Sequence, residues 1–112
     1  MDPTIKHQWT EALRSGQYPQ GKEWLRNADG AYCCLGVLCE LHRQTQDLTG
    51  LQWTREQNDQ AYHYGDCCSL LPEAVLEWAG LPEDDAVVEE LVCQNDDGAL
   101  FPTIADYIEE HL

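Results

Sequence analysis

The stretch 31-AYCCLGVLCELH-42 decides the fold, because it is apolar on nearly every side of any regular structure it forms. An element that is hydrophobic all round is buried at the centre of a protein. Periodicity alone does not separate a buried helix from a buried strand that leads into one, so both remain open for this stretch. Gly36 lowers the helix propensity of this stretch. Because glycine has no side chain, we expect a neighbouring element to pack closely against it.

Helices are predicted on both sides of this stretch. Asp2 and Pro3 suit the N-cap and first position of a helix whose apolar residues recur at helical spacing, and Gly16 suits its end. Three further helices are predicted to begin at prolines, Pro72, Pro82 and Pro102, and Gly80 suits the end of the first of them. Two short aromatic stretches, 51–54 and 61–64, fit either a small β-hairpin or a loop. The prediction is a mainly α protein: a single compact domain, residues 1–112, of about five helices around one core.

Charge is distributed unevenly along the chain. Residues 1–43 hold five basic and five acidic side chains, whereas residues 44–112 hold one basic side chain, Arg55, against sixteen acidic ones. The net charge of −15 therefore lies entirely in the second part. The electrostatic field of so many negative charges repels nucleic acid and attracts basic partners. An acidic surface can also act simply to keep a protein soluble. Crowded carboxylates are expected to have raised pKa values, so that mild acidification would stabilise the fold.

The six cysteines are interpreted as reduced core thiols, because no secretory signal is visible and three of them lie among apolar residues. They are Cys33, Cys34, Cys39, Cys67, Cys68 and Cys93. Structural zinc sites space their cysteines by about two to four residues, whereas these cysteines include two adjacent pairs. A site made of Cys67 or Cys68 with His63 and a distant thiol stays open as an alternative. The prediction is no metal and no cofactor.

No catalytic motif stands out. No local signature ties a histidine to a cysteine, and the carboxylates are too numerous to single out a pair for acid–base chemistry. The chain has no phosphate-binding glycine loop, and no apolar run is long enough to span a bilayer. The sequence therefore predicts a non-enzymatic, soluble protein of a reducing cytosol, without a membrane and without direct nucleic-acid binding.

Four stretches, in chain order, carry a resemblance to known proteins. They are EALRSGQYPQG (Glu11–Gly21), YCCLGVLCEL (Tyr32–Leu41), LPEAVLEWAGL (Leu71–Leu81) and NDDGALFPTIADYIEEHL (Asn95–Leu112). They resemble a family of small, functionally uncharacterised proteins of bacterial viruses and prophages, which has no fixed pattern over residues 44–68. The resemblance implies accessory work in the cytoplasm of an infected bacterium. Small acidic viral proteins of that kind often inhibit host defences, as anti-CRISPR proteins do, and some of them imitate the phosphates of DNA.

The first functional hypothesis is an inhibitor that binds a basic, nucleic-acid-binding surface of a host protein. The carboxylates expected to make the contact are Glu83, Asp84, Asp85, Glu89, Glu90, Asp96 and Asp97. Duplex DNA carries one charge per about 1.7 Å and a helix advances about 1.5 Å per residue, so an acidic helix face roughly matches a row of phosphates.

The alternative hypothesis is a protein that sequesters a small molecule, such as a nucleotide signal, in a pocket of the neutral N-terminal part. The expected lining is Trp9, Arg14, Tyr18, Gln20 and Asn95. An aromatic ring would stack on a base while the polar side chains hold its polar groups. The polar members of this set equally suit capping and turn hydrogen bonds, which their residue types favour.

Overall fold

The computed structural model describes residues 1–46, 50–82 and 86–112, and in these ranges it forms five helices and a small antiparallel sheet. The helices are α1 (Pro3–Arg14), α2 (Cys34–Thr45), α3 (Glu73–Ala79), α4 (Ala86–Asp96) and α5 (Phe101–His111). The strands are β1 (Arg26–Asn27), β2 (Trp53–Thr54) and β3 (Ala61–Tyr64), in the order β1-β3-β2. The predicted mainly α fold is confirmed.

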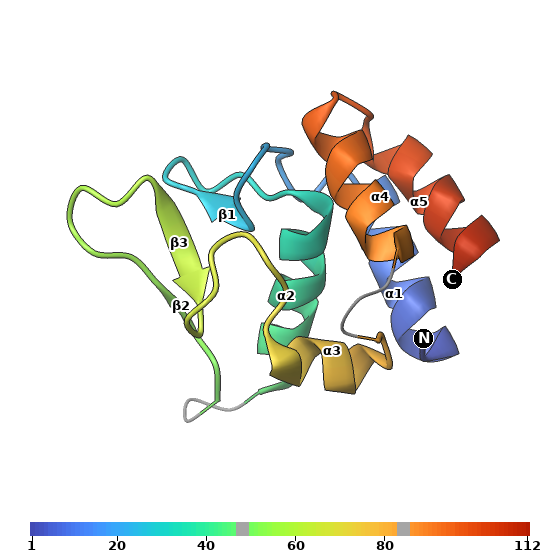
Figure 1. Cartoon of the computed structure of the whole chain (residues 1–112), viewed down its shortest axis with the longest axis horizontal. Helices are drawn as coiled ribbons and strands as arrows, with labels where there is room; N and C mark the ends of the chain where they lie inside the picture. Colours follow the sequence, from blue (N-terminus) through green and yellow to red (C-terminus); the bar gives the residue numbers. More distant parts are fainter. Residues whose placement is uncertain (47–49, 83–85) are drawn as a thin grey trace.

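Helix α2 is the central element of the molecule. Every residue from Cys34 to Glu40 is buried, as is His42, so the apolar stretch is a helix rather than a strand. The sheet lies on one side of α2, while α1, α4 and α5 pack together on the other and α3 crosses its C-terminal end (Figure 1). None of the described helices has both the length and the apolar composition needed to cross a membrane.

Local signals place the ends of the outer helices. The Asp2 carboxylate accepts a hydrogen bond from the Ile5 N–H (3.0 Å) and caps α1. Gly16 and Gly80 follow α1 and α3 with φ of 75° and 71°, in the left-handed region that favours glycine. These helix ends agree with the prediction.

The two aromatic stretches form a hairpin. β2 and β3 pair in antiparallel fashion, with Trp53 opposite Tyr64. β1 adds to the other edge of β3, with Arg26 opposite Tyr62. Strand β1 was not predicted, because its second residue, Asn27, also starts a turn, in which its side-chain Oδ1 accepts hydrogen bonds from the N–H groups of Asp29 and Ala31 (both 3.0 Å).

Of all the glycines, Gly36 has the closest backbone neighbour. A Cβ atom at this position would overlap the backbone carbonyl group of Leu25. That segment cannot retreat easily, since Leu25 N–H donates to the Cys68 carbonyl (2.7 Å) and its own carbonyl accepts the Cys33 N–H (3.3 Å). The expected close packing at Gly36 is confirmed, and it joins the central helix to the chain that enters the sheet.

Replacing Gly36 with alanine is therefore expected to lower the free energy of unfolding by more than about 3 kcal/mol, because the overlap is with backbone rather than with a movable side chain. The matched control is Gly16→Ala, where nothing lies within 4 Å of the new Cβ and only the left-handed φ of 75° is strained. That control should lose about 1 kcal/mol. Urea unfolding of both variants measures the difference, and equal losses would contradict the close contact.

Candidate functional site

Asn95 lies at the centre of a buried hydrogen-bond network. Its side chain is fully buried, and its Oδ1 accepts from the Cys34 N–H and from Gln20 Nε2 (both 3.2 Å). Its Nδ2 donates to the Gly21 carbonyl (2.8 Å). Cys34 is the first residue of α2, whose N-cap residue Cys33 provides no side-chain hydrogen bond. Asn95 therefore caps α2 from a distant part of the chain.

Gln20 does the same for α5. Its Oε1 accepts the N–H of Phe101 (3.1 Å), the first residue of that helix, whose N-cap residue Leu100 makes no side-chain cap. Its Nε2 also donates to the Ala99 carbonyl (2.7 Å). Both amides are thus committed to helix ends, as their residue types favoured, and neither is presented to a ligand.

Trp9 and Arg14, two further residues of the predicted pocket, also make contacts within the protein. Trp9 is fully buried and donates its Nε1 hydrogen to the Cys34 carbonyl (2.9 Å), so it has no face to stack on a ligand. Arg14 turns to α5, where it binds Asp106 (2.7 Å) and both oxygens of Glu109 (2.8 and 3.0 Å). The structure thus brings Trp9, Gln20 and Asn95 together around Cys34 and places Arg14 against α5, and all four hold elements together.

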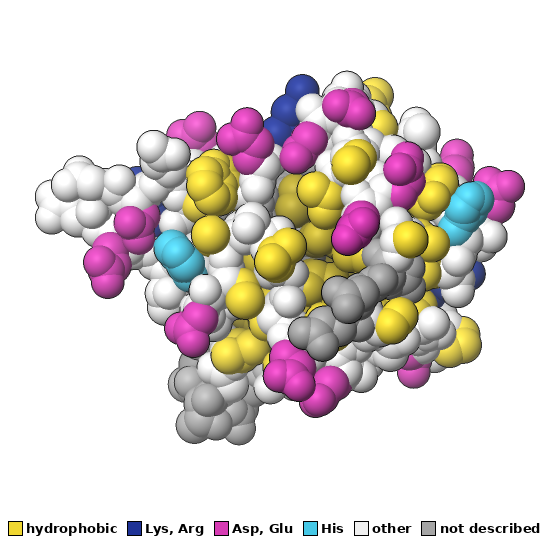
Figure 2. Space-filling model, viewed as in Figure 1, with side chains coloured by type: hydrophobic (Ala, Val, Ile, Leu, Met, Phe, Trp, Pro, Cys, Tyr) yellow, Lys and Arg dark blue, Asp and Glu magenta, His cyan; other side chains and the backbone are white. Residues whose placement is uncertain are grey.

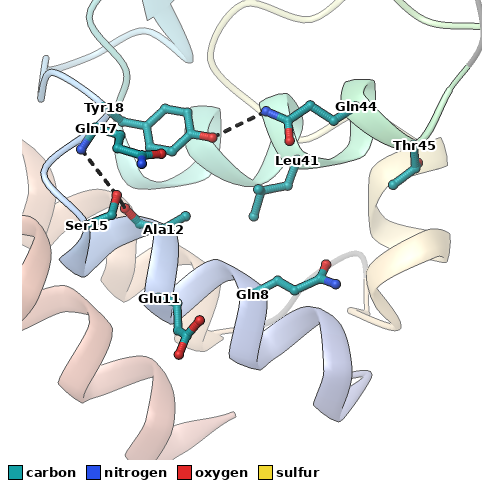
Figure 3. Close-up of a pocket in the computed structure, with 9 residues that line it drawn as sticks. All are labelled: Gln8, Glu11, Ala12, Ser15, Gln17, Tyr18, Leu41, Gln44 and Thr45. Atoms are coloured by element: carbon teal, nitrogen blue, oxygen red, sulfur yellow. Dashed lines mark hydrogen bonds between the residues drawn. The ribbon is translucent and has the colours of Figure 1, made fainter.

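A cavity does lie beside Tyr18. It has a volume of about 590 Å³ and opens between α1 and the C-terminal half of α2. Figure 3 shows Tyr18 at one end, with Leu41 and Gln44 reaching in from α2 and Gln8 from α1. Most of its nine lining residues carry uncharged hydrogen-bonding groups, and the sequence missed it because its two helices are about 30 positions apart.

The predicted acidic contact residues are only partly described. Glu83, Asp84 and Asp85 lie outside the described residues. Glu89, Glu90 and Asp97 are exposed on or just after α4. Asp96 is half-buried and accepts the Glu23 N–H (2.9 Å), which gives it a structural role as well.

A cluster that the sequence did not indicate surrounds Arg26. Its guanidinium carbon lies 4.5 Å from the ring centre of Tyr62, 5.2 Å from that of Tyr32 and 5.8 Å from that of Trp53. Such cation–π contacts contribute about 0.5–2 kcal/mol each, more when water is excluded. Among the described residues no group accepts a hydrogen bond from the buried Arg26 Nε. The four residues come from separate segments, so no spacing rule could have joined them.

The whole chain, residues 1–112, matches the family model described as a domain of unknown function, DUF8296. The chain belongs to the DUF8296 family. No curated protein and no solved structure matches it.

Glu40, His42 and Glu109 of this DUF8296 chain have lowered pKa values. Burial raises the pKa of Glu40, but hydrogen bonds from Arg43 (2.8 Å) and Trp53 (3.0 Å) outweigh it and leave the pKa lowered. Burial alone lowers the pKa of His42, whose Nδ1 lies 2.6 Å from the Tyr64 hydroxyl. A hydrogen bond from Arg14 also lowers the pKa of Glu109. Both carboxylate shifts are opposite in direction to those expected from charge crowding.

Thiol chemistry is disfavoured in the buried part of the DUF8296 domain. Burial raises the pKa of Cys33 to about 11 and raises those of Cys34 and Cys39 well above the usual range. The thiolate is the nucleophilic and metal-binding form, so these three side chains act as small apolar residues. The described residues contain no group of three or more His, Cys, Asp or Glu side chains placed to hold a metal ion.

The lowered pKa of His42 predicts a loss of stability on acidification. Below about pH 6.5, the ordinary pKa of histidine, the unfolded chain binds a proton that the folded chain does not. Acidification therefore stabilises the unfolded state relative to the folded state. The melting temperature should therefore fall between pH 7 and pH 5.5. Glu40 adds a further loss below about pH 4.5, because its lowered pKa has the same sign.

His42→Gln is the matched control, since it keeps a hydrogen-bonding side chain and removes the titration. Its melting temperature should depend less on pH over the same interval. A wild-type melting temperature that rises on acidification would instead support repulsion among the carboxylates.

Proposed function

We propose that the domain is a non-enzymatic binding protein that docks its acidic C-terminal part onto a basic surface of a partner protein. In the viral setting that the sequence resemblance implies, the partner is a nucleic-acid-binding defence protein of the bacterial host and the outcome is its inhibition. The observation that carries the proposal is the group of exposed carboxylates on α3, on α4 and just after α4 that make no ion pair within the described part of the chain.

Five exposed carboxylates belong to this group: Glu73, Glu77, Glu89, Glu90 and Asp97. Within the described part of the chain, none of them takes part in an ion pair. No lysine or arginine follows Arg55 in the sequence, and Arg14 is already bound to Asp106 and Glu109 on α5. These carboxylates therefore remain available to cations of a partner, which they attract over about a Debye length, 8–10 Å.

The exposed positions on α4 follow one face of the helix. They include Glu89, Glu90 and Cys93, and Asp97 continues the same spacing past the helix end. From Glu89 to Asp97 a helix advances about 12 Å. Duplex DNA carries about seven charges over that length, so these three carboxylates alone are less dense than the phosphates. Binding to a basic surface is favoured over close imitation of DNA on this face.

Apolar side chains lie among the acids. Figure 2 shows acidic side chains distributed around a more apolar centre on the face that carries α3 and α4. The described apolar residues of this region include half-buried Val88 and Val92, with Leu70 at 72 % exposure. Protein interfaces combine an apolar core with a polar rim, and charged rims mainly raise the association rate and its dependence on salt.

The test uses the triple variant Glu89→Gln, Glu90→Gln and Asp97→Asn. Partners retained from a bacterial host lysate should be nucleic-acid-binding proteins, displaced by added duplex DNA and by salt between about 50 and 200 mM. The triple variant should bind about tenfold or more weakly, since exposed charge pairs contribute up to about 1 kcal/mol each.

The matched control neutralises three exposed acids of the N-terminal part: Glu11→Gln, Glu23→Gln and Asp29→Asn. It changes the net charge by the same amount and should leave retention unchanged. Retention that is insensitive to salt, or equally weakened in both triple variants, would refute the docking surface.

A further inference from the structure

The pocket between α1 and α2 is built for a ligand of different chemistry. We propose that it binds a small, uncharged, planar molecule with amide-like hydrogen-bonding edges, of the nucleobase or nucleoside class, and that it excludes phosphorylated forms. This site is separate from the acidic face and does not depend on the proposed function.

The pocket has a fixed aromatic wall and an apolar floor. The Tyr18 ring packs edge-on against Tyr32, with ring centres 5.7 Å apart and planes at 82°, and its hydroxyl accepts a hydrogen bond from Gln44 Nε2 (3.3 Å). Ala12 and Leu41 are half-buried between the two helices and also line the pocket. A held tyrosine ring beside apolar side chains suits a flat ring system, and stacking of a base on an aromatic side chain contributes about 1–3 kcal/mol.

Three of the polar side chains that line the pocket are amides. Gln8 comes from α1, Gln17 from the loop after it and Gln44 from α2. Among the described residues, the side-chain amides of Gln8 and Gln17 make no hydrogen bond. An amide presents a donor and an acceptor side by side, which matches the edge of a heterocyclic base. The side-chain amides of Gln8 and Gln17 are therefore able to hydrogen-bond a ligand in this cavity, as the few polar groups of a ligand pocket usually do.

The hydroxyls of the lining are less free. Ser15 Oγ donates to the Ala12 carbonyl (2.6 Å) and Thr45 Oγ1 donates to the His42 carbonyl (2.7 Å). Their hydrogens are committed to the backbone, and each oxygen already accepts one hydrogen bond, from the Gln17 N–H and from Gln46 Nε2 (both 3.2 Å), so one lone pair on each remains for a ligand. They can accept hydrogen bonds from the amino or imino groups of a base or from a ribose hydroxyl.

Charge in the pocket excludes phosphate. Among the described residues that line it there is no lysine or arginine, and the one formal charge is the carboxylate of Glu11, which lies 3.2 Å from His7 Nε2. Arg14 is on the same helix but turns to α5 and is ion-paired there. A phosphate would find no cation to bind, within a chain of net charge −15. The class of ligand suggested by the sequence, a nucleotide signal, is therefore narrowed to an uncharged nucleobase or nucleoside.

The experiment is an NMR titration of the ¹⁵N-labelled protein with adenosine, guanosine, cytidine and uridine, each followed by its 5′-monophosphate. At least one nucleoside should produce saturable shifts that include the side-chain NH₂ signals of Gln8 and Gln17. Its monophosphate should bind at least tenfold more weakly. No saturable shifts with any nucleoside, or equal or tighter binding of the monophosphate, would overturn the proposal.

Two variants separate this site from the acidic face. Gln8→Leu with Gln17→Leu removes both free amides at exposed positions, and it should weaken nucleoside binding at least tenfold. Glu89→Gln with Glu90→Gln should leave nucleoside affinity unchanged. If the leucine variant, still folded by its amide spectrum, binds the nucleoside as well as the wild type, the amides are not its anchors and the site is refuted.

Discussion

The structure depends on the pair of amide side chains, Asn95 and Gln20, that caps two helices from outside them. The buried N–H groups at the starts of α2 and α5 have no side-chain cap from their own N-cap residues, and a buried donor left without a partner costs about 1–3 kcal/mol. Asn95 accepts from Cys34, Gln20 accepts from Phe101, and the two amides bind each other. The end of α4 and the loop after α1 are thereby tied to the central helix.

Cys34 is the point at which these elements meet. Its N–H binds Asn95, its carbonyl accepts from Trp9 on α1, and its thiol donates to the Leu91 carbonyl on α4 (3.6 Å). The N–H, carbonyl and thiol of this fully buried residue are therefore all hydrogen-bonded to residues outside α2, on α1 and α4. Because the polar and aromatic residues around it are occupied in this way, the two surfaces proposed for binding lie on the outside of the protein. These are the acidic face of α3 and α4 and the pocket between α1 and α2.

The parts of the fold that follow from local physics could be predicted from the sequence. The Asp2 cap, the left-handed glycines at 16 and 80, and the burial of the central stretch each depend on residues a few positions apart. The candidate sites depend on residues that are distant in sequence. Asn95 and Gln20 are 75 positions apart, so residue type suggested capping without showing which helix ends were capped. Of the predicted pocket only Tyr18 lines the observed cavity, since the others face the core or a neighbouring helix.

The capping role of the two amides is tested by a double-mutant cycle, measured by urea unfolding, with Gln20→Ala, Asn95→Ala and the combination. Asn95→Ala alone should lower the free energy of unfolding by about 3 kcal/mol or more, because it leaves the Cys34 N–H and the Gly21 carbonyl without their side-chain partner. The coupling free energy between the two sites should be about 1 kcal/mol or more. Single losses within about 0.5 kcal/mol that add without coupling would show instead that the two amides do not hold the helix starts.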